Sequence, residues 1–211
     1  MKIIGVSGGV SYGALGLTHH STQDIALMRA TTGLEIFIPA DGPQMEALTK
    51  YLAQSDDPAY VRMGRGAVPV VYEADVSFVP GKANRLRKGS QAAIIACGEM
   101  VYRSLQAALI LEAEGIDTAV YDMHTLRPLD RSAILEAAET NFVVTVEEHS
   151  IHGGLGGAVA EVLSQKRPTK MRILGLPDEK LYTGSSTEVM AHYGLTPEGI
   201  AQVVREGRLL R

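Results

Sequence analysis

The sequence predicts an α/β fold, and two observations lead to that class. Short apolar runs alternate with longer segments of helical spacing along almost all of the 211 residues. Most of the apolar runs, such as 92–97 and 141–148, show little sign of a polar face. Such runs are typical of strands buried on both faces of a parallel sheet. The repeated strand–helix order indicates βαβ units.

The expected elements follow in a regular order. Strands are predicted at 2–7, 34–39, 59–63, 92–97, 117–123, 141–148 and 170–176. Helices are predicted near 21–31, 42–54, 99–115, 129–139, 153–165 and 196–207. Asp41 precedes Pro43 at the start of the second helix, which is a typical start signal. Asp130 can cap the fourth helix in the same way.

Composition limits the possible classes of function. The net charge of −4 argues against a nucleic-acid partner. No stretch approaches 18 uninterrupted apolar residues, so we expect no membrane partner. The single cysteine, Cys97, lies in an apolar run and is expected to be a buried structural thiol. One cysteine excludes an internal disulfide and fits a reducing compartment, so we expect a cytoplasmic protein.

The chain is expected to contain two modules. A segment with prolines, mixed charge and no helical period spans 67–90. We therefore expect domains at 1–75 and 88–211, joined by a linker at 76–87. The first module holds only about three strands and two helices, which is thin for an independent α/β domain. We interpret this shortfall as truncation.

Two sets of motifs carry a resemblance to a known family. The segments "GLTHHSTQDIALMRATTGLEIFIPAD" (16–41) and "DPAYVRMGRG" (57–66) resemble the later part of the pyrimidine-binding domain of the transketolase family. The segments "YDMHTLRPLD" (121–130) and "VEEHSIHGGLGGAVAEVL" (146–163) are similar to the transketolase C-terminal domain. The resemblance implies a truncated pyrimidine-type domain followed by a mainly parallel-sheet C-terminal domain.

The resemblance also implies an activity and its cofactors. Members transfer a two-carbon ketol unit between sugar phosphates, as in the pentose phosphate pathway, with thiamine diphosphate and Mg²⁺. The cofactor performs the bond-breaking chemistry, and the protein supplies binding, orientation and electrostatics. The cofactor-binding residues are expected before Met1, so the chain alone is expected to be inactive and not to bind the cofactor. The expected partner is the N-terminal section, on the same chain or separate, together with a homodimer formed through the C-terminal domain.

The family motif "GPTHQ" falls on residues 16–20, which implies that His19 is a catalytic residue that contacts substrate hydroxyls. His20 receives no role. Arg62 and Arg65 are expected to include at least one contact to the substrate phosphate. Ser7 stands where some relatives have a further substrate-binding histidine, and Leu15 stands where many have an acidic residue that reads a substrate hydroxyl. Ser7 implies that this contact is weakened or absent, and Leu15 puts the usual acceptor preference in doubt.

The second module is expected to be structural. His124 lies at a turn, and Tyr182 and His192 receive no role. The segment 147–157 combines carboxylates, histidines and glycines, but we expect a tight strand-to-helix turn there rather than a metal site or a phosphate cradle. Three alternatives stay open: a deoxyxylulose-phosphate synthase-like chain, a 2-oxo acid dehydrogenase β-like chain, and a non-catalytic dimerisation or assembly module.

Overall fold

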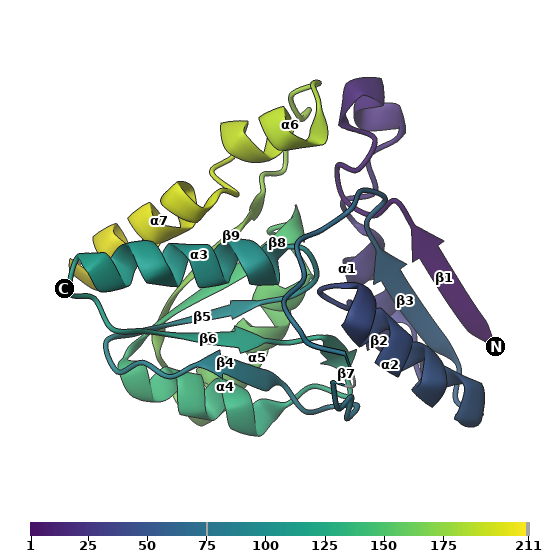
Figure 1. Cartoon of the computed structure of the whole chain (residues 1–211), viewed down its shortest axis with the longest axis horizontal. Coiled ribbons are helices and arrows are strands. Elements are labelled where there is room, and N and C mark those ends of the chain that lie inside the picture. The colour runs from purple at the N-terminus through teal and green to yellow at the C-terminus, as the bar shows by residue number, and fades with distance from the viewer. Residues whose placement is uncertain (75, 210–211) are drawn as a thin grey trace.

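The computed structural model describes residues 1–74 and 76–209. The domain boundary expected at residue 75 and the end of the chain at 210–211 lie outside the described residues. The described chain forms two mixed, mostly parallel sheets flanked by helices (Figure 1). The α/β class is therefore confirmed. No helix in the described part is long and apolar enough to cross a lipid bilayer.

The first sheet has the strand order β1-β3-β2-β7. Its parallel strands are β1 (Lys2–Val6), β3 (Ala59–Met63) and β2 (Glu35–Phe37), and β7 (Thr125–Arg127) pairs antiparallel with β2. Two helices belong to this part: α1 (Asp24–Ala30) and α2 (Gly42–Gln54). Strand β1 lies at the edge of the sheet, and its apolar side chains are largely exposed.

The second sheet has the strand order β4-β6-β5-β8-β9. All of its neighbours run parallel except β4. The strands are β4 (Asn84–Arg87), β6 (Thr118–Asp122), β5 (Ala92–Ala96), β8 (Phe142–Ser150) and β9 (Lys170–Leu176). Strands β5, β6 and β8 are buried along their whole length. This burial explains why their sequences show no polar face.

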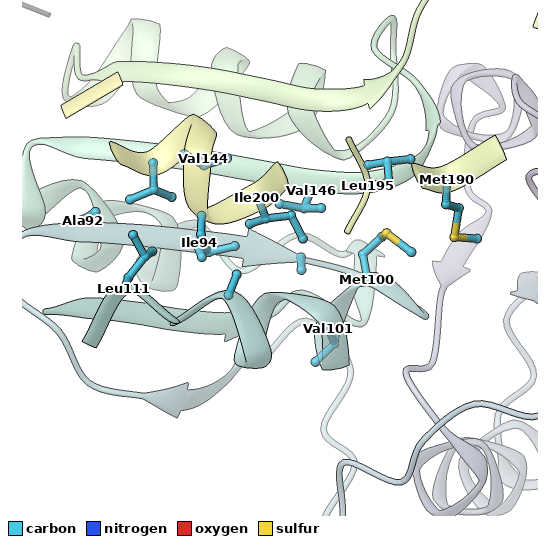
Figure 2. Packing of buried hydrophobic residues seen from close by; sticks show 14 of the residues in the cluster. Ala92, Ile94, Met100, Val101, Leu111, Val144, Val146, Met190, Leu195 and Ile200 are labelled. Atoms are coloured by element: carbon cyan, nitrogen blue, oxygen red, sulfur yellow. The ribbon is translucent and has the colours of Figure 1, made fainter. Parts of the chain in front are cut away.

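Four helices cover the two faces of this sheet (Figure 1). Helices α3 (Met100–Ala113) and α7 (Pro197–Leu209) lie on one face, and α4 (Arg131–Ala137) and α5 (Leu155–Lys166) lie on the other. Alternate residues of β5 point to opposite faces of the sheet. Ile94 packs in a hydrophobic cluster with residues of α3 and α7, and Ile95 packs in a second cluster with residues of α4 and α5. Figure 2 shows Ile94 among the side chains of α3 and α7.

The two sheets are joined directly. Strand β7 follows β6 in the chain but pairs with β2 of the first sheet. The main chain continues this joint, because the Ile38 N–H donates to the His124 carbonyl over 2.8 Å. Asp122 Oδ2 accepts hydrogen bonds from Gln44 Nε2 and from the Tyr72 hydroxyl, both at 2.6 Å. Asp122, which lies in the second sheet, thus holds α2 and the segment between β3 and β4 in place.

Four elements lie outside the expected set. Strand β4 lies in the segment read as a linker, and its polar sequence fits an edge strand. Strand β7 has only three residues. The 3₁₀ segment η1 (Gly13–Thr18) lies in a glycine-rich loop, and α6 (Ser186–His192) begins with a capping box between Ser185 and Glu188. The caps expected at Asp41 and Asp130 are both confirmed.

Candidate functional site

The loop that carries His19 depends on a glycine. Gly16 adopts φ 70° and ψ −161°, a conformation that is essentially restricted to glycine. A Cβ atom at this position would lie 2.9 Å from Thr183 Oγ1. The His19 N–H donates to the Gly16 carbonyl over 2.9 Å, which ends η1. The loop therefore rests on the segment before α6, beside which it lies in Figure 1, and this contact places His19.

His19 is exposed and turned toward an aromatic neighbour. Its Nδ1 lies 2.9 Å from Thr18 Oγ1. Its ring meets the Tyr12 ring edge to face, with the centroids 6.1 Å apart. Within residues 1–74 and 76–209, Nε2 has no hydrogen-bond partner. That nitrogen can donate to or accept from a hydroxyl of a bound molecule.

Arg65 contacts the same tyrosine. Its guanidinium carbon is 4.5 Å from the centre of the Tyr12 ring, a cation–π distance. Arg65 is exposed and makes no ion pair with the described residues. Tyr12 thus brings His19 and Arg65 to one surface. Only a weak signal for Tyr12 exists in the sequence: it is the one aromatic residue in the loop between β1 and His19.

Arg62 occupies a different environment. Its side chain is only 6% exposed, and its Nε lies 3.1 Å from Asp24 Oδ2. Its Nη2 donates to the Glu148 carbonyl over 2.6 Å, and the Tyr60 hydroxyl donates to Asp24 over 2.7 Å. Burial opposes the charge of Arg62, but Asp24 and Glu148 outweigh it and raise its pKa. Arg62 therefore ties β3, α1 and β8 together from inside the protein.

The turn after β1 closes over Arg62. Ser7 is half-buried and adopts φ 67°, which is uncommon for a residue with a side chain. A Cβ atom on Gly8 would lie 2.5 Å from Arg62 Nε. The Val10 N–H donates to Glu148 Oε1 over 2.7 Å. The turn thus places Tyr12 and the η1 loop relative to the buried arginine.

In the glycine-rich segment 153–157, a carboxylate of the protein already accepts hydrogen bonds from backbone N–H groups. Glu147 accepts the N–H groups of Leu155 and Gly156, each over 2.7 Å, at the start of α5. A side chain on Gly154 would collide with this carboxylate. Burial raises the pKa of Glu147 to about 7. Because the carboxylate occupies the N-terminus of the helix, the segment does not fit a bound diphosphate.

The histidine of this segment is also internal. His149 is fully buried, and its Nδ1 donates to the Ser150 carbonyl over 2.7 Å. Its Nε2 lies 3.3 Å from the Ala26 N–H, which donates to it. Burial lowers the pKa of His149. In the described part of the chain, no group of three or more His, Cys, Asp or Glu residues could hold a metal ion.

The remaining singled-out residues make other contacts within the protein. Burial lowers the pKa of His124 to about 4, and its ring packs on Phe78 with centroids 4.4 Å apart. His20 Nε2 lies 3.4 Å from the Gly13 carbonyl. Tyr182 stacks on His192, with centroids 5.0 Å apart. Cys97 is buried as expected, and burial raises its pKa well above the usual value.

The fold and the placement of these motifs are those of one enzyme family. Residues 81–200 match the family model described as "Transketolase, C-terminal domain". Residues 1–71 match the model described as "Transketolase, pyrimidine binding domain". The first match alone covers more than half of the chain, so the chain belongs to the transketolase C-terminal domain family. The expected resemblance is confirmed.

Two relatives and one solved structure narrow the comparison. The chain is 51% identical over 208 residues to a subunit of apulose-4-phosphate transketolase from Phocaeicola vulgatus, covering 98% of this chain and 66% of the relative. It is 36% identical to the 6-deoxy-6-sulfo-D-fructose transketolase subunit SqwH of Clostridium sp., covering 98% and 64%. A solved structure described as "Split gene transketolase, inactive beta4 tetramer" superposes with a TM-score of 0.88 at 38% identity, covering 99% and 66%. The chain thus spans just under two thirds of the length of these relatives.

Proposed function

We propose that this chain is the carboxyl-terminal part of a split-type transketolase and contributes the substrate-binding edge of a shared active site. Ketol transfer then requires a partner that supplies the remaining part, on a longer chain or as a separate subunit. The 51% identity to one subunit of a transketolase and the match to both family models support this proposal. The 38% identical solved structure is described as an inactive tetramer, which is consistent with a chain that is inactive alone.

The observation that carries the proposal is the contact of both His19 and Arg65 with Tyr12. His19 contacts the hydroxyls next to the reacting carbonyl, because an imidazole can donate or accept near neutral pH. Arg65 contacts the anionic end of the sugar, because its guanidinium offers forked donors and has no carboxylate partner in the described chain. Of the two arginines, Arg65 therefore takes the phosphate-binding role and Arg62 positions the surrounding elements.

An arginine suits the substrates that the relatives' names give. The first name contains a sugar phosphate and the second a sulfonated sugar. Both sugars carry an anionic group. Leu15 is 54% exposed near this surface and cannot accept a hydrogen bond from a substrate hydroxyl. We infer a sugar phosphate or sulfosugar that needs no hydroxyl contact at that position. This preference differs from a strict pentose phosphate pathway role.

Thiamine diphosphate and Mg²⁺ are the cofactors that we assign to the complete enzyme. When bound, the cofactor supplies the carbanion that accepts the ketol unit. The glycine-rich segment 153–157 does not fit the diphosphate, so we place that binding site in the partner. A dimer formed through the second sheet and a cytoplasmic location belong to the same proposal.

Reconstitution tests the proposed function. Calorimetry should detect no binding of thiamine diphosphate and Mg²⁺ to the chain alone, and binding once a partner that carries the amino-terminal transketolase section is added. His19→Ala should then keep cofactor binding and lose most of the ketol transfer, with His20→Ala as the matched control. Cofactor binding to the chain alone, or full transfer by His19→Ala, would refute the assignment. Transfer from pyruvate instead of a ketose would favour the synthase-like alternative.

A further inference from the structure

A cavity lies at the far end of helix α1, away from the candidate site. Helix α1 begins with Asp24, which pairs with Arg62, and it ends at Ala30. At that end, α1, the segment between β7 and α4, and helix α5 enclose a cavity of about 460 Å³. This volume lies in the range of small-molecule sites in proteins. None of the residues of the proposed substrate edge lines it.

The charges around this cavity are unbalanced. Four cationic side chains line it, Arg29, Arg127, Arg131 and Lys166, against one carboxylate, Glu161. The protein as a whole carries a net charge of −4. The cavity beside β4, in contrast, is balanced, with two cations and two carboxylates. Cations around one cavity repel one another, and a bound anion relieves that repulsion.

Two of the four cations have structural partners. Arg29 donates to the carbonyls of Gly153 and Gly154 over 2.6 and 3.1 Å and pairs with Glu161 at 2.8 Å. Arg127 donates to the carbonyls of Arg29 and Thr31 at the end of α1. These contacts fix both guanidinium groups in the wall of the cavity. Among the described residues, no carboxylate pairs with Arg127.

The other two cations have no partner in the described residues. Arg131 is exposed and starts α4, where the helix dipole disfavours a positive charge. Lys166 is exposed at the end of α5. Apolar side chains, including those of Leu126 and Val162, form part of the lining. A cavity whose lining combines some apolar side chains with two unpaired cations fits a small organic anion better than a free inorganic ion.

We propose that this cavity, the α1–α4–α5 cavity, binds a small phosphorylated metabolite at a site separate from the substrate edge. Arg131 and Lys166 contact the phosphate, and Arg29 and Arg127 supply the fixed positive field. Glu161 weakens binding, because its carboxylate faces the same cavity and neutralises Arg29. The proposal does not depend on the function assigned to His19 and Arg65.

Titration calorimetry tests the site at low ionic strength with D-ribose 5-phosphate and, separately, with inorganic phosphate. The full chain carries Arg65→Gln throughout, so that the proposed substrate edge does not contribute. We expect binding at one site, a loss of at least tenfold in affinity in Arg131→Gln/Lys166→Gln, and tighter binding in Glu161→Gln. Weaker binding of inorganic phosphate than of the sugar phosphate identifies an organic ligand.

The control removes two cations elsewhere. Lys88→Gln/Lys180→Gln has the same net charge as the test variant, and both lysines are exposed outside this cavity. It should bind within twofold of the parent protein. Equal losses in the two double variants, no heat from the parent, or weaker binding in Glu161→Gln would each overturn the proposal. Circular dichroism and thermal unfolding verify that all variants are folded.

Discussion

Tyr12 is the residue that brings the proposed substrate contacts together. Its ring contacts both His19 and Arg65, although the two lie in separate segments of the chain. The order of the chain cannot reveal such a contact, because it depends on the turn after β1 and on the loop after β3. Contact with the Tyr12 ring fixes the position of the His19 imidazole relative to the Arg65 guanidinium, although both side chains are exposed.

At the same scale, Gly16 should be more important for activity than for stability. Gly16→Ala forces a side chain into a strained conformation and against Thr183, at a cost of about 1–3 kcal/mol. It also displaces His19, so ketol transfer by the reconstituted enzyme should fall much further than the folded fraction. Gly33→Ala is the control, since Gly33 has φ 74° but open space around it. Equal effects of both variants on turnover would contradict this role.

Sequence patterns single out His19 as the proposed substrate contact but cannot separate the two arginines. Arg62 and Arg65 stand on either side of a strand end. Only the fold determines that Arg62 points to Asp24 and Glu148 inside the protein, while Arg65 reaches Tyr12 at the surface. The helix caps and most strands could be predicted because their signals are local. Strand β7 could not, because its pairing with β2 is a long-range contact.

At the scale of elements, one buried ion pair joins a strand, a helix and the second sheet. Arg62 lies in β3, Asp24 starts α1, and the carbonyl that Arg62 contacts belongs to β8. The side chains of Arg62 and Asp24 are 6% and 9% exposed. Removing one charge from such a pair leaves the other charge buried and uncompensated, which is costlier than removing both.

Arg62→Leu should therefore destabilise the protein by about 3–5 kcal/mol. Arg62→Leu/Asp24→Asn should recover part of this loss, because the buried carboxylate is then neutral. Urea unfolding of the parent, both single variants and the double variant gives the coupling free energy. A coupling free energy near zero would mean that the pair does not hold β3 and α1 together.

At the scale of the whole molecule, the two sheets meet at a buried carboxylate. Asp122 accepts hydrogen bonds from Gln44 of α2 and Tyr72 of the connecting segment. Burial raises its pKa from the usual value near 4 to about 7. The native state therefore holds this proton over a pH range in which the unfolded chain has released it. The carboxyl form stabilises the joint, and that stabilisation is lost as the pH rises through 7.

Asp122→Asn should remove this pH dependence. Between pH 4 and 7, the free energy of unfolding of the parent should fall relative to the variant by up to about 1.4 kcal/mol per pH unit. His124 and His149 also titrate abnormally, but they are present in both proteins and cancel in the difference. Denaturant unfolding at several pH values measures this difference. If the difference in unfolding free energy does not change with pH, the raised pKa of Asp122 is contradicted.

The surface formed by His19, Tyr12 and Arg65 is central to the proposed function, because it would bind an anionic sugar within a larger enzyme. The most direct measurement compares the enzyme reconstituted with wild-type chain and with Arg65→Gln, using D-glyceraldehyde 3-phosphate and D-glyceraldehyde as acceptors. Loss of a charge-assisted contact predicts that kcat/KM falls about 10- to 100-fold for the phosphorylated acceptor and stays nearly constant for the other. Equal falls for both acceptors, or no change for either, would contradict the claim.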